Sequence, residues 1–306
     1  MELGYYKSID DFLGVRQGRY FGDGYLKSSQ IIRDFGISGS LNALQISCVG
    51  AVSLPAMWSQ KGGTQQKPHL STIDVIELAL ECLRQFRIGM RRGDELSTDL
   101  LSSISIVAGS SPVEEDMDAL AITGQVLLDD EAGEVMLLNI ANMEVHLRLR
   151  PRGHGVARGL TFCRQPVELS EVLLNTEGMQ ASAMASSGGQ VGVGQSRAGQ
   201  SGGAWSLSAS FACALQLGQL LLYKLDKIDR TKSNTLWMKR THISFSDLMP
   251  SGGGVQPIHA HLDDVLKYTK ADGEWRRANV CAAFCNVQIT CRVTHRLPGP
   301  AVHLVQ

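Results

Sequence analysis

Two acidic residues on a predicted helix are the first candidates for chemistry in this sequence. Asp74 and Glu77 lie in the segment Thr72–Arg87, whose apolar residues recur at helical spacing. A carboxylate that such a helix turned into a cavity would have a raised pKa and could act as a general acid or base. We therefore predict Glu77 or Asp74 as the catalytic base. The same polar stripe continues to Glu81 and Arg84, so a solvated helix face is the alternative interpretation.

A histidine stands just before this helix. His69 follows Pro68 and precedes Ser71 and Thr72, either of which can cap the helix start. Backbone N–H groups at a helix start can bind an anion or a polarised carbonyl oxygen. We predict His69 as a third catalytic residue that donates a hydrogen bond to the substrate; the alternative is an ordinary loop histidine.

A second helix is predicted over Ser208–Asp226. It is apolar nearly all round, which is typical of a buried helix. Gln216 and Gln219 are polar exceptions, and a buried amide is costly unless it is hydrogen-bonded. These two amides either fasten the core or bind a substrate, and we predict them as substrate-binding residues.

The segment that follows this helix is polar and contains one tryptophan. Asn234, Trp237 and Arg240 could together hold a sugar or a phosphate, so we predict them as substrate-binding residues. The alternative is a plain connection between a helix and a strand. His259 and His261 share one strand face, but no third ligand is near, and no metal site is predicted.

Several short segments recur in the same order along the chain. Ser102–Val107 resembles Thr241–Ser246 at an offset of 139 (241 − 102 = 139), and Asn142–Val145 resembles Asn286–Ile289 at 144 (286 − 142 = 144). These matches indicate two copies of one unit. We predict a first unit over 1–151, with an N-terminal extension, and a second over 152–306, with a Gly- and Ser-rich insertion near 181–203.

Each copy places strands after its helix. In the first copy they are predicted over Leu101–Ala108, Ala119–Leu128 and Val135–Arg150. In the second they are predicted over Ile258–Tyr268 and Val280–Arg296. Helices combined with antiparallel strands indicate an α+β fold. The 181–203 insertion is either a mobile lid or disordered filler.

Composition narrows the class of protein. The 306 residues suffice for two units, and a net charge of −1 gives no sign of nucleic-acid binding. No apolar run is long enough to span a membrane, and the first residues do not resemble a signal peptide. Seven cysteines without zinc-site spacing favour reduced thiols, so we expect a cytoplasmic protein.

Two motifs point to a family. The run Leu3–Arg16 followed by Arg19–Gly22 resembles the start of the avirulence protein D family of plant-associated bacteria. The runs ALQLGQLLLYKLDKIDR and SNTLWMKR are similar to the same family. That resemblance implies a role in making syringolides, which are acyl-glycoside elicitors assembled from a β-ketoacyl chain and a ketopentose such as xylulose.

The first helix carries a looser resemblance. Ile73–Phe86 looks like the central helix of hot-dog acyl-thioester enzymes, which include polyketide dehydratases and butenolide synthases. With two copies, this implies a tandem (double) hot-dog, in which an antiparallel sheet wraps each long helix. The dehydratase aspartate about four residues before Gln216 is replaced by Ala212, and the histidine-glycine-proline signature is not intact. Both departures argue against dehydration.

Together these observations predict an acyltransferase-like enzyme. It would join a β-ketoacyl thioester, carried by acyl carrier protein or coenzyme A, to a ketopentose or its phosphate, without a bound cofactor. The alternatives are a non-catalytic acyl- or lipid-binding protein and a hot-dog thioesterase or dehydratase.

Overall fold

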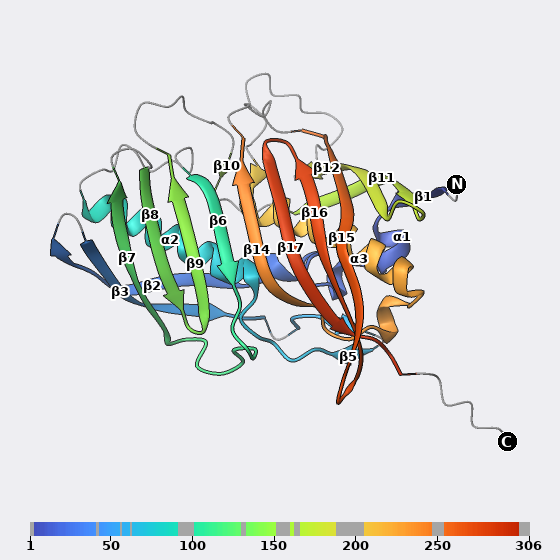
Figure 1. Cartoon of the computed structure of the whole chain (residues 1–306), viewed down its shortest axis with the longest axis horizontal. Coiled ribbons are helices and arrows are strands. Elements are labelled where there is room, and N and C mark those ends of the chain that lie inside the picture. The colour runs from blue at the N-terminus through green and yellow to red at the C-terminus, as the bar shows by residue number, and fades with distance from the viewer. Residues whose placement is uncertain are drawn as a thin grey trace, which may run out of the picture.

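Thirteen strands form one antiparallel sheet that runs through both halves of the chain (Figure 1). The computed structural model describes residues 3–40, 43–55, 57–61, 63–90, 101–129, 133–150, 160–161, 166–187, 205–246 and 254–299. The first half contributes β1 (Leu3–Ser8), β2 (Ser29–Ser40), β3 (Ala43–Ser53), β6 (Leu101–Val107), β7 (Leu120–Asp129), β8 (Gly133–Ile140) and β9 (Met143–Leu149). The second half contributes β11 (Val167–Asn175), β12 (Gln180–Ser187), β14 (Trp237–Phe245), β15 (Gln256–Lys270), β16 (Gly273–Phe284) and β17 (Val287–Arg296).

The two halves correspond strand for strand. From the centre outward, the order β6-β9-β8-β7-β3-β2 on one side matches β14-β17-β16-β15-β12-β11 on the other. β6 and β14 pair at the centre, where Ile104 lies opposite Ile243, and these residues are 139 positions apart (243 − 104 = 139). Residues 139 positions apart in the sequence are therefore related by a pseudo-twofold axis that passes through this strand pair.

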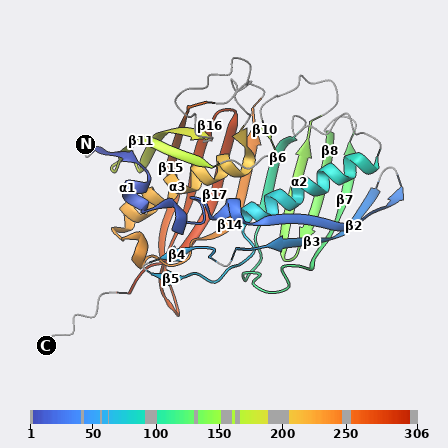
Figure 2. The same cartoon turned by 180° about the vertical axis from the view of Figure 1, so that it is seen from behind.

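Two long helices lie on the same face of the sheet (Figure 2). α2 (Thr72–Gly89) packs on β2, β8 and β9, and α3 (Leu207–Asp226) packs on β11, β12, β15, β16 and β17. Each helix follows a pair of strands and precedes four more, and the sheet curves around it. This is a tandem hot-dog fold of the α+β class, which confirms the predicted fold.

Local sequence explains where both helices begin. Ser71 caps α2 in a capping box, in which its hydroxyl accepts from the backbone N–H of Asp74 at 3.1 Å and its own N–H donates to the Asp74 carboxylate at 3.0 Å. Ser206 caps α3 by accepting from the backbone N–H of Ala209 at 3.1 Å. The predicted helix bounds are confirmed to within two residues.

The N-terminal arm, which we define as residues 3–28, crosses to the second half. It comprises β1, the short helix α1 (Asp10–Leu13) and the 3-10 turns η1 (Arg16–Gly18) and η2 (Gly24–Lys27). β1 pairs with β11, so that Tyr5 lies opposite Leu173 at the far edge of the sheet. The arm then passes over α3 toward the start of α2, which ties the two halves together (Figure 2).

Two long predicted strands are each a hairpin. Val135–Arg150 divides into β8 and β9 at Ala141, and Val280–Arg296 divides into β16 and β17 at Cys285. Both turn residues have positive φ, at 51° and 54°. The buried positions are mainly even-numbered before each turn and mainly odd-numbered after it, so a shift in the alternation marks both breaks, and the prediction of one continuous strand overlooked it.

The predicted insertion near 181–203 begins with regular structure. Residues 181–187 belong to β12, where alternate alanines point into the core against α3. Small side chains there are a packing requirement rather than a sign of a loop. Residues 188–204 lie outside the described residues. None of the described helices is long and apolar enough to cross a membrane.

Candidate functional site

Two adjoining cavities lie where the halves meet. The central cavity encloses about 60 Å³, against roughly 10–15 Å³ for a single water. It is bounded by the arm, the strand β4 (Gln60–Lys61), the start of α2, the middle of α3, and the segment from the 3-10 turn η5 (Arg230–Lys232) into β14. Its lining residues are Arg19, Tyr20, Phe21, Trp58, Ser59, Lys61, Gln66, His69, Ser71, Gln219, Arg230, Thr235, Leu236 and Met238.

The outer cavity is larger, at about 180 Å³. It shares His69, Ser71, Leu236 and Met238 with the central cavity. The loop after β6 and the hairpin of β15 and β16 complete its wall, with Trp237, Lys239, Lys270 and Trp275. These four shared side chains therefore form the wall between two cavities that differ in volume and in their other lining residues.

His69 stands in the wall between the two cavities. Its ring packs edge-on against Trp58, with centroids 4.5 Å apart, and lies 5.4 Å from the ring of Trp237. Nδ1 lies 3.2 Å from the carbonyl oxygen of Lys67 and donates to it, which leaves Nε2 as the unprotonated nitrogen of a neutral ring. Burial lowers the pKa of His69, so the ring is neutral at pH 7 and can accept a proton.

Asp74 acts on the cavities through Ser71. Its carboxylate is fully buried and accepts hydrogen bonds from Ser71, Ser28 and Gln30. The Ser71 hydroxyl donates to Asp74 at 2.7 Å and accepts from the Tyr20 phenol. This series of hydrogen bonds from Tyr20 through Ser71 to Asp74 therefore fixes the two hydroxyl groups of Tyr20 and Ser71 in the central cavity wall. The Asp74 side chain itself lines neither cavity.

Glu77 joins the two helices. The hydroxyl of Ser208, in the first turn of α3, donates to the Glu77 carboxylate. A carboxylate at a helix start is favoured by the helix dipole and by the N–H groups there. Glu77 is half-buried and belongs to neither cavity wall.

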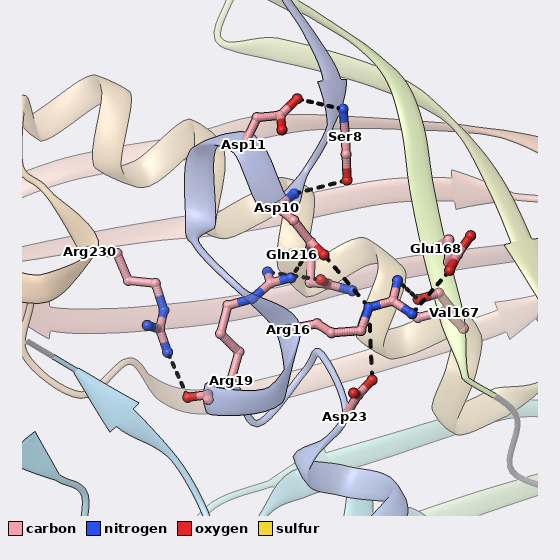
Figure 3. A network of polar contacts seen from close by, with 11 residues as sticks. Ser8, Asp10, Asp11, Arg16, Arg19, Asp23, Val167, Glu168, Gln216 and Arg230 are labelled. Atoms are coloured by element: carbon pink, nitrogen blue, oxygen red, sulfur yellow. Dashed lines mark hydrogen bonds and ion pairs between the residues drawn. The ribbon is translucent and has the colours of Figure 1, made fainter. Parts of the chain in front are cut away.

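Arg19 enters the interior from the arm (Figure 3). It is 2 % exposed, and Nη1 donates to the amide oxygen of Gln216 at 3.0 Å while Nη2 pairs with Asp10. Its Nε is buried without a hydrogen-bond partner. Burial, opposed by Asp10 and reinforced by Arg230, lowers the pKa of Arg19 to about 10. Gln216 thus fastens the arm to α3.

Lys61 and Arg230 bring two more cations to the central cavity. Arg230 uses Nη2 to donate to the carbonyl oxygens of Gln60, at 2.9 Å, and Gly18, at 3.3 Å. Lys61 donates to the carbonyl oxygen of Asn234 at 2.5 Å. Burial and the charge of Arg230 lower the pKa of Lys61 to about 7. None of the described residues that line the central cavity is acidic.

The remaining predicted binding residues fall in different places. Gln219 lines the central cavity, and Trp237 lines the outer cavity against His69. Asn234 uses its amide to donate to the carbonyl oxygen of Arg296 at 2.9 Å. Arg240 is exposed, because it alternates along β14 with Thr241 and Ile243, whose side chains are buried.

Sequence reasoning missed the three cations. Arg19 and Arg230 both lie within the family-like runs, so the signal was present, but positions 19, 61 and 230 share no periodicity. His259 and His261 are exposed on the outer face of β15, and among the described residues no three metal-binding side chains gather at one place.

Comparisons of structure find similar folds at low sequence identity. A protein named as a thioesterase from Novosphingobium aromaticivorans matches 86 % of this chain and 98 % of its own, with 10 % identity and a TM-score of 0.45. A hot-dog protein from Alicyclobacillus acidocaldarius covers 86 % and 97 %, with 6 % identity and a TM-score of 0.43. A polyketide dehydratase domain from Brevibacillus brevis covers 85 % and 96 %, with 8 % identity and a TM-score of 0.41.

The fold and site define a tandem hot-dog protein with its cavities at the junction of the halves. The model of the Pseudomonas avirulence D protein (AvrD) family matches residues 4–153 and 149–298. The chain belongs to the AvrD family, as the N-terminal and second-helix motifs indicated. A search of curated proteins found no match.

Proposed function

We propose that the protein transfers a β-ketoacyl group from a thioester to a hydroxyl of a ketopentose or its phosphate. The position of His69 carries this proposal: one neutral imidazole forms part of the wall of both cavities. A base in that place can serve a sugar in one cavity and a thioester in the other. Membership of the AvrD family supports the same class of chemistry.

The step needs one base and donors for the carbonyl oxygen. The sugar hydroxyl oxygen attacks the thioester carbonyl carbon, a C–O bond forms, and the C–S bond breaks. Nε2 of His69 accepts the hydroxyl proton and passes it to the leaving thiolate, so the ring ends unchanged. The thioester lies in the outer cavity beside Thr72, in the first turn of α2, where backbone N–H groups lack helical partners.

The two predicted carboxylates then have positioning roles. Asp74 orients Ser71 and, through it, Tyr20. Glu77 fixes the start of α3 against α2 through Ser208. Coenzyme A or acyl carrier protein supplies the acyl group as substrate, and no resident cofactor takes part.

The test uses purified protein with a β-ketoacyl thioester and either xylulose or xylulose 5-phosphate, and follows the acyl-sugar by mass spectrometry. His69→Asn keeps a polar group near Lys67 and should lower turnover by at least about 100-fold. Because burial lowers the pKa of His69 below 6.5, wild-type turnover should stay constant as pH falls to about 6.5 and decline only below it.

His261→Asn is the matched control, since that ring is exposed on the outer face of the sheet. It should leave turnover unchanged. A folded His69→Asn protein with wild-type turnover would show that His69 is not the base and would contradict the proposed mechanism. Release of free β-keto acid without any acyl-sugar would show thioester hydrolysis and contradict acyl transfer.

A further inference from the structure

The central cavity gathers positive charge that the protein itself does not neutralise. Arg19 comes from the arm, Lys61 from β4 and Arg230 from η5. Asp10 neutralises Arg19, but Lys61 and Arg230 make no ion pair with any described residue. Bringing cations together in a poorly solvated space costs free energy, so this arrangement calls for an anionic partner.

The two arginines keep hydrogen-bond donors that have no acceptor. Both bonds of Arg230 with described residues use Nη2, while its Nε is buried without a partner. Nε of Arg19 is likewise buried and unpartnered. A buried donor without an acceptor costs roughly 1–3 kcal/mol. Two such guanidinium groups at one cavity are a second, independent sign that an acceptor belongs there.

The size and charge of the space indicate the kind of anion. The cavity holds about 60 Å³, which suits the head of a ligand and not its whole body. An anion beside Lys61 favours the protonated form of this lysine, so that Lys61 and Arg230 together match a group of charge near −2 with several acceptor oxygens. A phosphate monoester carries about −1.5 to −2 at pH 7 and is bound well by arginine forks.

We propose that Arg19, Lys61 and Arg230 form a binding site for a phosphate monoester in the central cavity. This inference rests on the proposed function only for the source of the phosphate group. That group is either the phosphate of a ketopentose phosphate or the 3′-phosphate of coenzyme A. In the first case the sugar would extend past Gln219 toward His69, which places its hydroxyl beside the base.

Titration calorimetry on the whole protein tests the site without any acyl transfer. Xylulose 5-phosphate should bind at least about 10-fold more tightly than xylulose if the sugar carries the phosphate. Coenzyme A should exceed dephospho-coenzyme A by a similar factor if the cofactor phosphate is the ligand. Inorganic phosphate should compete with whichever phosphorylated ligand binds.

Variants then assign the binding to these residues. Lys61→Met and Arg230→Met should each weaken binding of the preferred phosphorylated ligand about 10- to 100-fold and leave affinity for its dephosphorylated form unchanged. Lys232→Met is the control, because that side chain is exposed in the same turn as Arg230 and lines neither cavity.

Two outcomes separate this site from the proposed function. Equal affinity for phosphorylated and dephosphorylated ligands, unaffected by both variants, would overturn the phosphate site even if acyl transfer proceeds. Tight phosphate-dependent binding that both variants abolish would establish the site even if no acyl-sugar forms.

Discussion

The helices α2 and α3 occupy equivalent places in the two halves, yet their surroundings differ. α3 is buried along nearly its whole length, because the sheet covers one side and the N-terminal arm covers another. α2 keeps an open face, where Glu81 pairs with Arg84 and Gln85 in solvent. The long helix of this repeated unit is thus either partly solvated or almost fully buried, depending on whether another segment of the protein covers the helix.

This difference decides what the polar residues of each helix do. Counted from the N-caps Ser71 and Ser206, Gln216 of α3 corresponds to Glu81 of α2 (216 − 206 = 10 and 81 − 71 = 10). Glu81 makes a surface ion pair, whereas Gln216 binds the buried Arg19. Where the arm covers α3, a neutral amide stands at the position of the solvated charge of α2 and binds Arg19 beside the cavity.

Removing the buried arginine should have the largest effect on stability. Arg19→Met leaves Gln216 without its partner and Asp10 with only its longer contact to Arg16, at 3.6 Å, and losing one member of a buried ion pair typically costs about 3–5 kcal/mol. Urea unfolding should show this loss. Arg84→Met, at the exposed pair on α2, should cost less than about 1 kcal/mol, and equal losses would mean that the arm does not stabilise α3.

The two helix caps should also differ. Asp74→Ala removes the capping box and a carboxylate that accepts from Ser71, Ser28 and Gln30, so we expect a loss of about 2–3 kcal/mol. Ser206→Ala removes one cap bond and should cost about 1 kcal/mol. Thermal or urea unfolding measures both, and a reversed order would contradict the network assigned to Asp74.

In each half a glycine allows the helix and the sheet to lie close together. The glycine is on the helix in the second half and on a strand in the first half. A Cβ on Gly218 of α3 would come within 2.8 Å of both Val280 methyl groups, and one on Gly50 of β3 would meet Ile122 at 2.8 Å and Leu78 of α2 at 3.3 Å. Gly218→Ala should destabilise by about 1–2 kcal/mol, since overpacking exceeds the gain in helix propensity. The double variant Gly218→Ala/Val280→Ala should recover part of this overpacking cost, and no recovery would remove the contact as its cause.

The smallest expected effect is a gain. Lys61 has a pKa of about 7 in the folded protein and 10.5 when unfolded, so the unfolded chain binds more protons between these values. The penalty for the buried charge is therefore full below pH 7 and fades as pH rises toward 10.5. Lys61→Met should raise Tm by roughly 1–3 °C at pH 6 and by less at pH 9.

Lys67→Met is the control for this gain. Hydrogen bonding to Glu114 raises the pKa of Lys67, and its side chain is exposed, so its removal should give no increase in Tm. A Tm difference for Lys61→Met that does not shrink with pH would exclude charge burial as its origin.

Local signals in the sequence predicted much of the fold. Ser71 and Asp74 predicted the start of α2, and the repeat at an offset of 139 identified β6 and β14 as equivalent strands, though not that they pair with each other. The helices do not share this offset, since their caps are 135 positions apart (206 − 71 = 135), and the segments between helix and strand therefore differ in length between the two copies. No local pattern in the sequence predicted the pairing of β1 with β11. The two strands are far apart in the chain, and β1 pairs with β11 because β11 would otherwise form the edge of the sheet.

The site was predictable only where one segment carries it. His69 could be found because a histidine before a helix start is a local arrangement, and Trp237 because it is aromatic within a polar run. Arg19, Lys61 and Arg230 meet through the folding of three segments, and each alone is an ordinary surface-type residue. Arg240 was wrongly grouped with Trp237, because Arg240 alternates with the buried Thr241 and therefore lies on the exposed face of β14.

The pairing of β1 with β11 sets an order of events during synthesis. Residues made first must wait for residues 167–175 before their strand partner exists. At about 5–20 residues per second this delay is roughly 10–30 s. Arg19 is carried by the same arm, so a nascent first half lacks one wall of the central cavity. Gln219, Arg230 and Met238 also line that cavity, so the complete cavity exists only when translation has delivered most of the second repeat.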